Sequence, residues 1–177
     1  RKGIMYVPSN DVPNLIWLEK TSEENVYYEY SMHWEFINDQ FGHPGSKPPW
    51  GSLTAINLST GKKIWQIPFG EYEELTEKNI PITGTFNYGG VTGTAGNLLF
   101  ATGTLDNKIR AYNSTNGDEL WSFKLPYSGS SPPTIFEFNE EQYVLVPATG
   151  STTMKSAYPE ISKYGNKIFA FKLKNDK

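Results

Sequence analysis

Residues that could do chemistry are few in this chain. It has no cysteine, which excludes disulfides and thiolate metal sites. Its two histidines, His33 and His43, lie in a segment rich in Gly, Pro and polar residues. A histidine there could face a substrate or shuttle protons, but a surface imidazole is the simpler prediction. Asp11, Asp39 and Asp106 have no further ligand at metal-binding spacing, so we predict no metal site.

The segment Thr85–Gly90, with the sequence Thr-Phe-Asn-Tyr-Gly-Gly, is the best candidate for binding a ligand. The side-chain amide of Asn87 can donate hydrogen bonds, and Gly89 lets a partner approach the backbone closely. The alternative is a glycine-rich start of a strand in which Tyr88 only covers a wall. The sequence alone does not decide between the ligand-binding and the structural interpretation.

Two further polar segments have simple structural interpretations. Gly129–Thr134 could offer hydroxyl groups to a ligand, but its two prolines favour a rigid turn. The acidic residues Glu71, Glu73, Glu74 and Glu77 fit the solvated face of a short helix. That segment, residues 71–78, is the one place where we expect helix, and Pro81 limits its length.

An internal repeat predicts the elements that position these residues. Residues 55–65 and 111–121 share Ala, Asn, Gly and Trp at the same spacings, with an offset of 56 residues. Each copy has a strand ending in Asn, a polar turn completed by Gly, and a second strand carrying Trp. The Gly supplies the positive φ of a tight turn. This pattern is typical of a β-propeller blade, and we expect Trp65 and Trp121 to pack between adjacent blades rather than against a cofactor.

The fold class is therefore predicted to be all-β, a partial β-propeller. Strands are expected over residues 3–9, 52–57, 63–68, 98–103, 109–113, 119–125, 134–139, 142–147 and 167–173, and long loops over 32–50 and 151–164. Blades of about 40–50 residues give about three units, fewer than the roughly 4–8 that close a propeller. We expect one domain over 1–177, with a blade remnant (1–50), two blades (51–90 and 91–133) and an incomplete blade (134–177) whose outer strand comes from elsewhere.

Composition narrows the choice of partners. A net charge of −3 gives no reason to expect nucleic acid or an anionic membrane. No apolar run has the length of a membrane helix, and no signal peptide is visible. Because the chain starts without Met, we expect a processed chain or an excised piece. An open arc of blades also has unpaired strand edges, which could lead to self-association.

The repeated Ala-x-Asn-x-x-Thr-Gly-x-x-x-Trp pattern resembles the tryptophan docking motif of pyrroloquinoline quinone (PQQ)-dependent dehydrogenases. Asn57 and Asn113 stand where that motif usually has Asp, and Asn116 replaces its Thr in the second copy. The chain resembles the membrane glucose dehydrogenase branch more than the methanol dehydrogenase branch. The stretches that carry this resemblance are 49–51, 87–90, 94–101, 110–113 and 141–144.

The resemblance implies an eight-bladed propeller with PQQ on its axis and a calcium ion beside it. In that family a base removes a hydroxyl proton from a sugar or alcohol while hydride passes to the quinone. This chain resembles the C-terminal part, and the calcium ligands and the base belong to segments outside it. We therefore assign no catalytic residue and expect the isolated chain to be inactive. The parent enzyme is expected in the periplasm or outside the cell.

The resemblance also implies roles for the segment around residue 88. Asn87 would donate to a quinone carboxylate, and Gly89 would allow the backbone to approach the quinone. Tyr88 stands where related alcohol dehydrogenases have a Trp that reaches the quinone. The alternative is a non-catalytic repeat propeller without cofactor, acting as a scaffold or interaction platform, because function resides in sites rather than in folds.

Overall fold

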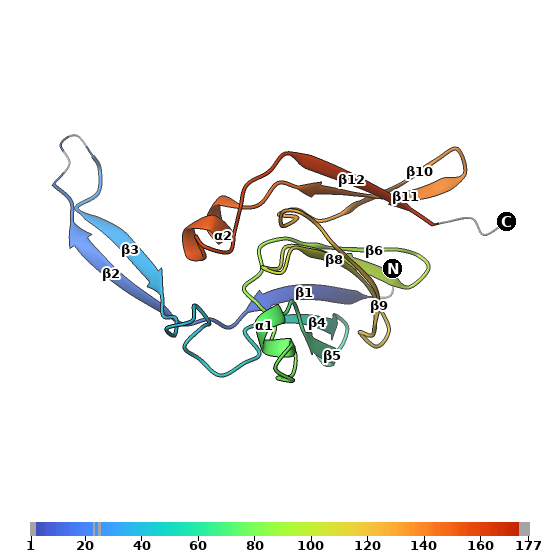
Figure 1. The fold of residues 1–177 in the computed structure, drawn as a ribbon, viewed down its shortest axis with the longest axis horizontal. Helices are drawn as coiled ribbons and strands as arrows, with labels where there is room; N and C mark the ends of the chain where they lie inside the picture. The colour runs from blue at the N-terminus through green and yellow to red at the C-terminus, as the bar shows by residue number, and fades with distance from the viewer. Residues whose placement is uncertain (1–2, 23, 25, 174–177) are drawn as a thin grey trace.

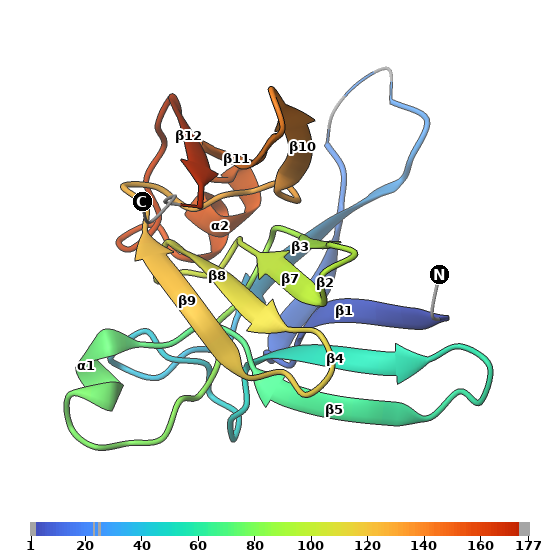
Figure 2. The ribbon, with the colours of Figure 1, turned by 90° about the vertical axis from the view of Figure 1, so that its right-hand side faces the viewer.

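The computed structural model describes residues 3–22, 24 and 26–173 and is almost entirely β-structure, as predicted. Three sheets follow one another through the molecule, and a separate hairpin projects from them (Figures 1 and 2). The limits of the predicted domain, residues 1 and 177, lie outside the described residues.

The first sheet has the order β1-β4-β5, and all its neighbours are antiparallel. Its strands are β1 (Ile4–Asn10), β4 (Gly51–Asn57) and β5 (Lys63–Pro68). β1 thus pairs with β4 across the predicted division at residue 50. The turn between β4 and β5 is the first copy of the repeat, and Gly61 adopts a φ of 66° there, which explains the need for glycine.

The second sheet has four antiparallel strands in the order β6-β7-β8-β9. Its strands are β6 (Val91–Gly93), β7 (Leu98–Ala101), β8 (Lys108–Asn113) and β9 (Glu119–Lys124). The second copy of the repeat lies between β8 and β9. Both copies have a register shift after their Ala, at Ala55 and Ala111, so the repeated sequence produces a repeated local geometry.

The third sheet has the order β10-β11-β12. Its strands are β10 (Thr134–Phe138), β11 (Glu141–Ala148) and β12 (Lys167–Lys172). Apolar side chains fill the spaces between the sheets. Leu53, Phe69, Leu99, Ala101 and Tyr112 lie between the first and second sheets, and Ile109, Leu125, Val144, Val146 and Ala148 lie between the second and third.

The two repeated tryptophans each contact the sheet that follows or its turn. The indole Nε1 of Trp65 donates to the carbonyl of Ser114 at 3.1 Å, in the turn between β8 and β9. The same indole lies against Gly117, where an added Cβ would be 3.0 Å from its ring. Trp121 lies edge-to-face with Phe171 of β12, at 5.2 Å between ring centroids.

Two segments expected to be loops contain regular structure. Residues 32–36 belong to β3 (Tyr30–Phe36), which forms a hairpin with β2 (Asn14–Lys20), so a loop beginning at residue 32 was wrong. The alternation of Tyr30, Met32, Trp34 and Phe36 with Ser31, His33 and Glu35 is a strand pattern that the Gly- and Pro-rich residues after it obscured.

The second of these segments, 151–164, contains α2 (Thr152–Ala157). Ser151 caps this helix because its hydroxyl accepts from the amide of Met154, and the buried Met154 side chain anchors it. The predicted short helix near residue 75 is present as α1 (Glu73–Thr76). No helix among the described residues is long and apolar enough to cross a membrane.

Candidate functional site

Five long connections gather at one end of the three sheets, which we call the loop end. They are residues 11–50, 69–90, 102–107, 125–133 and 149–166, whereas the opposite end has only tight turns. In Figure 1 the loop end is on the left, with α1, α2 and the hairpin. Loops of unequal length held by rigid sheets are the usual place for a binding site.

An aromatic cluster forms the interior of the loop end. Its buried members come from four connections and are Trp50, Tyr72, Phe86, Leu105, Met154 and Tyr158. Burial raises the pKa of Tyr158 to about 12 and raises that of Tyr72 as well, so both phenols are neutral at physiological pH. The cluster fixes the connections relative to one another, so they form one surface.

Asn87, a predicted cofactor ligand, is only 5% exposed and links the first and second sheets. Its side-chain amide donates to the carbonyl of Ser9 at 3.0 Å and to Oδ1 of Asn10 at 2.8 Å. Its backbone NH donates to the same Oδ1, and the Asn10 amide donates to the Asn87 carbonyl. Both side-chain hydrogens are therefore already used within the protein, and the predicted bond to a quinone carboxylate would have to replace one of these contacts.

Tyr88 and Gly89, the other two predicted cofactor ligands, differ in exposure. Tyr88 is 51% exposed at the loop end, and its backbone NH donates to the carbonyl of Gly103 at 2.8 Å. Gly89 packs against the next connection, where an added Cβ would be 2.6 Å from the Cα of Gly103. The close approach that glycine permits is therefore used by the protein's own backbone. Tyr88 is the member of this trio whose side chain is open to a ligand.

A buried ion-pair network lies beside this segment. Arg110 donates to both carboxylate oxygens of Asp106, at 3.1 and 2.5 Å, and reaches Glu119 at 3.1 Å. Asp106 also accepts from the Thr104 hydroxyl, the Lys108 amide and the Glu71 amide. Burial alone would raise the pKa of Asp106, but the charge and hydrogen bonds of Arg110 lower it overall. Asp106 therefore remains ionised and connects 69–90 to 102–107.

His43 is buried, at 8% exposure, which corrects the expected surface imidazole. Its ring lies parallel to that of Trp50 at 5.9 Å and edge-to-face with Tyr72 at 4.8 Å. Its Nε2 is 3.0 Å from Glu74 and its Nδ1 is 3.4 Å from Asp39. His43 thus attaches the connection before β4 to α1. His33 is partly exposed, stacked on Trp17 at 5.6 Å.

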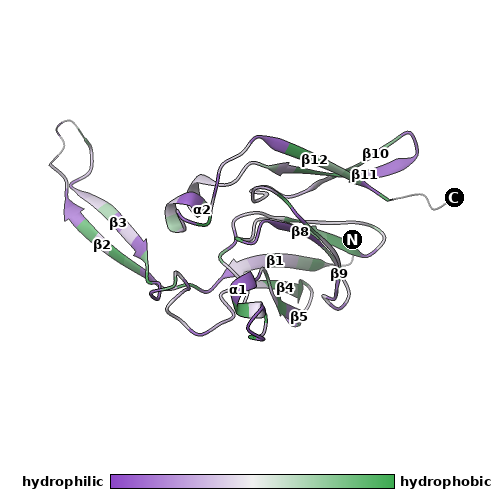
Figure 3. Ribbon diagram, viewed as in Figure 1, coloured by the Kyte–Doolittle hydropathy of each residue, from purple (hydrophilic) through white to green (hydrophobic). Residues whose placement is uncertain are grey.

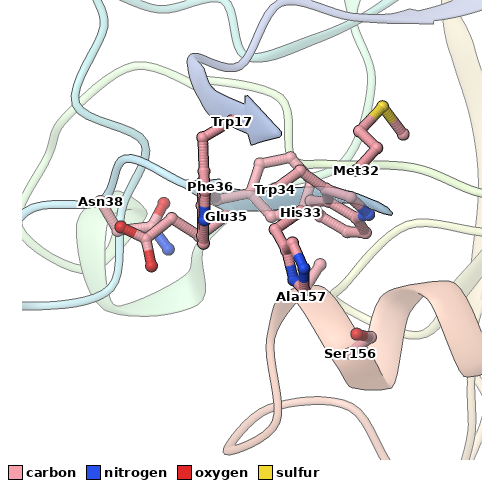
Figure 4. Close-up of a pocket in the computed structure, with 9 residues that line it drawn as sticks. All are labelled: Trp17, Met32, His33, Trp34, Glu35, Phe36, Asn38, Ser156 and Ala157. Carbon is pink, nitrogen blue, oxygen red and sulfur yellow. The ribbon is translucent and has the colours of Figure 1, made fainter. Parts of the chain in front are cut away.

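A groove of about 400 Å³ lies between β3 and α2. Figure 4 shows its lining residues, which are Trp17, Met32, His33, Trp34, Glu35, Phe36, Asn38, Ser156 and Ala157. It combines aromatic rings with a carboxylate, an amide and a hydroxyl. This groove was not predicted, because residues 32–36 of β3 and all of α2 were expected to be loop.

The other predicted binding segment is held as a turn. Thr102 donates its hydroxyl to the carbonyl of Gly129 at 2.5 Å, and the Ser130 and Thr149 hydroxyls are 3.4 Å apart. Within residues 3–22, 24 and 26–173, no group of three or more His, Asp or Glu side chains could hold a metal ion. Within the part described, the loop end therefore supplies the exposed Tyr88 ring beside a buried aromatic cluster, but not a metal centre.

Sequence reasoning missed Arg110 and His43 as organising residues. Arg110 belongs to a strand with alternating side chains, and a charged residue at an inward position would have been the signal for a buried partner. For His43 no local signal existed, since Glu74 lies 31 residues away in sequence.

Comparison with known proteins agrees with the predicted propeller fold. Residues 1–144 match the family described as PQQ glucose/ethanol/alcohol dehydrogenase, β-propeller domain. The chain is 36% identical over 141 residues to the quinoprotein glucose dehydrogenase of Escherichia coli, which covers 77% of this chain and 17% of that protein. It is also 36% identical over 129 residues to the quinate/shikimate dehydrogenase (quinone) of Acinetobacter baylyi, covering 69% of this chain and 16% of that protein.

Solved structures show the same fold. A europium-containing methanol dehydrogenase superposes with a TM-score of 0.69 at 20% identity, over 97% of this chain and 31% of that one. The three sheets therefore form part of a β-propeller, as the repeat predicted. The chain spans about a sixth of the length of the curated relatives that it matches.

Proposed function

The chain belongs to the β-propeller family of PQQ-dependent glucose, ethanol and alcohol dehydrogenases, and on that premise we propose that it forms one wall of the quinone site in a longer dehydrogenase. The observation that carries this proposal is the loop end, where an exposed aromatic side chain, Tyr88, lies on a rigidly held segment. The bound quinone would supply the two-electron acceptor.

The three site residues have two roles in this proposal. Tyr88 would present its ring to the quinone. Asn87 and Gly89 would position Tyr88, because one is bonded to Asn10 and the other packs on Gly103. The general base and a calcium ion would come from segments outside this chain, and the isolated chain would be inactive.

The substrate class we propose is a small aldose or alcohol, oxidised in the periplasm or outside the cell. The chain is 36% identical both to a relative named for glucose and to a relative named for quinate or shikimate. This similarity supports a hydroxylated small molecule and does not favour one of them. We further propose that Trp65 and Trp121 act as docking residues between blades, which their contacts with the next sheet support.

The test is a substrate panel on the longest parent protein, loaded with PQQ and calcium. We expect quinone-dependent oxidation of at least one of glucose, quinate and glycerol. Tyr88→Ala should reduce PQQ affinity at least tenfold, whereas Phe138→Ala, an exposed aromatic at the opposite end, should not. Wild-type PQQ affinity in Tyr88→Ala would reject the role of this residue.

A second candidate is a non-catalytic propeller that serves as a scaffold. One observation favours it: the donors of Asn87 and the close approach at Gly89 are both used in the protein's own packing. A folded parent protein that fails to bind PQQ would favour this alternative.

A further inference from the structure

The outer edge of β3 has unpaired backbone groups, and the register of the hairpin shows which ones. Ile37 N donates to the carbonyl of Pro13 and Thr21 N to that of Glu29, so odd-numbered residues form the hydrogen-bonded pairs. In an antiparallel pair these alternate with residues whose NH and C=O point away from the partner. Met32, Trp34 and Phe36 therefore direct their backbone groups outward. Within the described residues these groups have no protein partner.

These outward-facing residues all line the groove between β3 and α2. The wall opposite is formed by Ser156 and Ala157, whose small side chains leave the strand edge accessible. From Met32 to Phe36 the edge is about 13 Å long at ~3.3 Å per residue, which matches an extended segment of about five residues. An open strand edge beside a helix is the arrangement that accepts an added strand.

The charges around the groove indicate the chemistry of the occupant. Glu35 lines it and makes no ion pair within the described part of the chain. The described acidic residues of the hairpin are Glu19, Glu24, Glu29 and Glu35, against one lysine, Lys20. A second copy of the same hairpin would bring negative charges together, which is unfavourable. A partner with a basic side chain would instead place a positive charge near Glu35.

The hairpin also has an apolar face that an added strand would extend. Ile16, Leu18, Met32 and Trp34 share one face through the pairs Ile16–Trp34 and Leu18–Met32, and all four are exposed. Figure 3 shows the hydrophobic stretch on β2 of this projecting hairpin. A two-stranded ribbon is marginal in water, and a third strand would stabilise it.

We propose that this groove binds an extended segment of a partner polypeptide, about five residues long, as a strand paired to β3 with a basic side chain near Glu35. The groove is lined by none of the three residues that we assign to the quinone wall, and the proposal does not depend on quinone chemistry. The partner's backbone would satisfy Met32, Trp34 and Phe36, and its alternate side chains would lie beside Trp34 and Ala157.

The test is NMR on the ¹⁵N-labelled chain with the peptide acetyl-Lys-Val-Thr-Val-Lys-amide as probe. Saturating peptide should slow amide exchange at Met32, Trp34 and Phe36 at least tenfold. Ser31, His33 and Glu35 should not change, because their amides already bond to β2. The same peptide with N-methylated valines should not bind, since it lacks the required donors.

Two charge-reversal variants distinguish binding of the peptide in this groove from general electrostatic attraction to the acidic hairpin. Glu35→Lys should weaken binding of the basic peptide at least tenfold, and Glu24→Lys, the same charge change away from the groove, should have little effect. Equal effects of the two variants, or binding of the N-methylated peptide, would overturn the proposal. Slowed exchange that depends on protein concentration without peptide would also overturn it, in favour of a second copy.

Discussion

At the scale of residues, the clearest feature is that side chains suited to ligand binding also hold the connections in place. Asn87 could donate to an anionic ligand, yet its donors are used by Ser9 and Asn10. Asp106 and Arg110 are ionised and buried, and each is satisfied by the other. These groups keep the loop end rigid, which a site needs if Tyr88 is to meet a cofactor in one orientation.

Asn87→Ala should lower the free energy of unfolding by about 1–2 kcal/mol, because it removes the hydrogen bonds of the buried Asn87 amide to the Ser9 carbonyl and to Oδ1 of Asn10. Chemical denaturation at neutral pH measures this. Tyr88→Ala, one residue away and half exposed, is the matched control and should change stability by less than about 0.5 kcal/mol. If both variants unfold at the same denaturant concentration, the link between Asn87 and Asn10 has no energetic role.

Asp106→Asn should cost about 3 kcal/mol at pH 7, because Arg110 loses its main buried partner. The folded pKa of Asp106 is lowered below its ordinary value of 3.8. Its contribution is therefore fully present above that value and disappears as the pH falls through the lower folded pKa. Asp106→Asn should thus lose less stability than wild type on acidification below about pH 4.

Asp118→Asn provides the comparison, since Asp118 is exposed in the turn before β9. We expect it to keep the wild-type dependence of stability on pH. A wild-type acid profile in Asp106→Asn would contradict the ionised, paired state that we assign to Asp106.

At the scale of elements, the repeat accounts for most of what the sequence could predict. The Gly turns and the strands on both sides of them follow from local patterns, and the contacts of both tryptophans with the next sheet follow from the repetition itself. β3 and α2 were missed for different reasons. β3 needs β2 as its partner, and α2 depends on the burial of Met154 in a cluster assembled from distant segments.

The site was predictable only in part, for a related reason. Thr85–Gly90 was found because its composition is unusual, but the use of Asn87 depends on Asn10, 77 residues away. Local sequence cannot show that a donor is already bonded. The same applies to His43 and Glu74.

Trp65→Ala should destabilise the protein by about 2–3 kcal/mol, since it removes both the indole packed on Gly117 and the bond to Ser114. Trp121→Ala should cost less, because Trp121 is 39% exposed and contacts Phe171 mainly by its edge. Thermal unfolding of the two variants measures the difference. A larger loss of stability in Trp121→Ala would contradict the greater contribution that we assign to the contacts of Trp65.

At the scale of the whole molecule, three sheets stack with their long connections on the same end (Figures 1 and 2). The first and second sheets share an apolar core, as do the second and third, which is how adjacent propeller blades pack. The chain covers 17% of the length of its Escherichia coli relative, and its three sheets form part of a propeller. In our account this part faces the quinone with its loop end.

The most direct test is PQQ titration of the apo form of the longest parent protein, with calcium present, followed by dye-linked oxidation of glucose, quinate and glycerol. We predict one PQQ bound per propeller, and oxidation that begins only after PQQ is added. A folded parent protein that binds no PQQ, or that oxidises its substrate equally well without PQQ, would contradict the account.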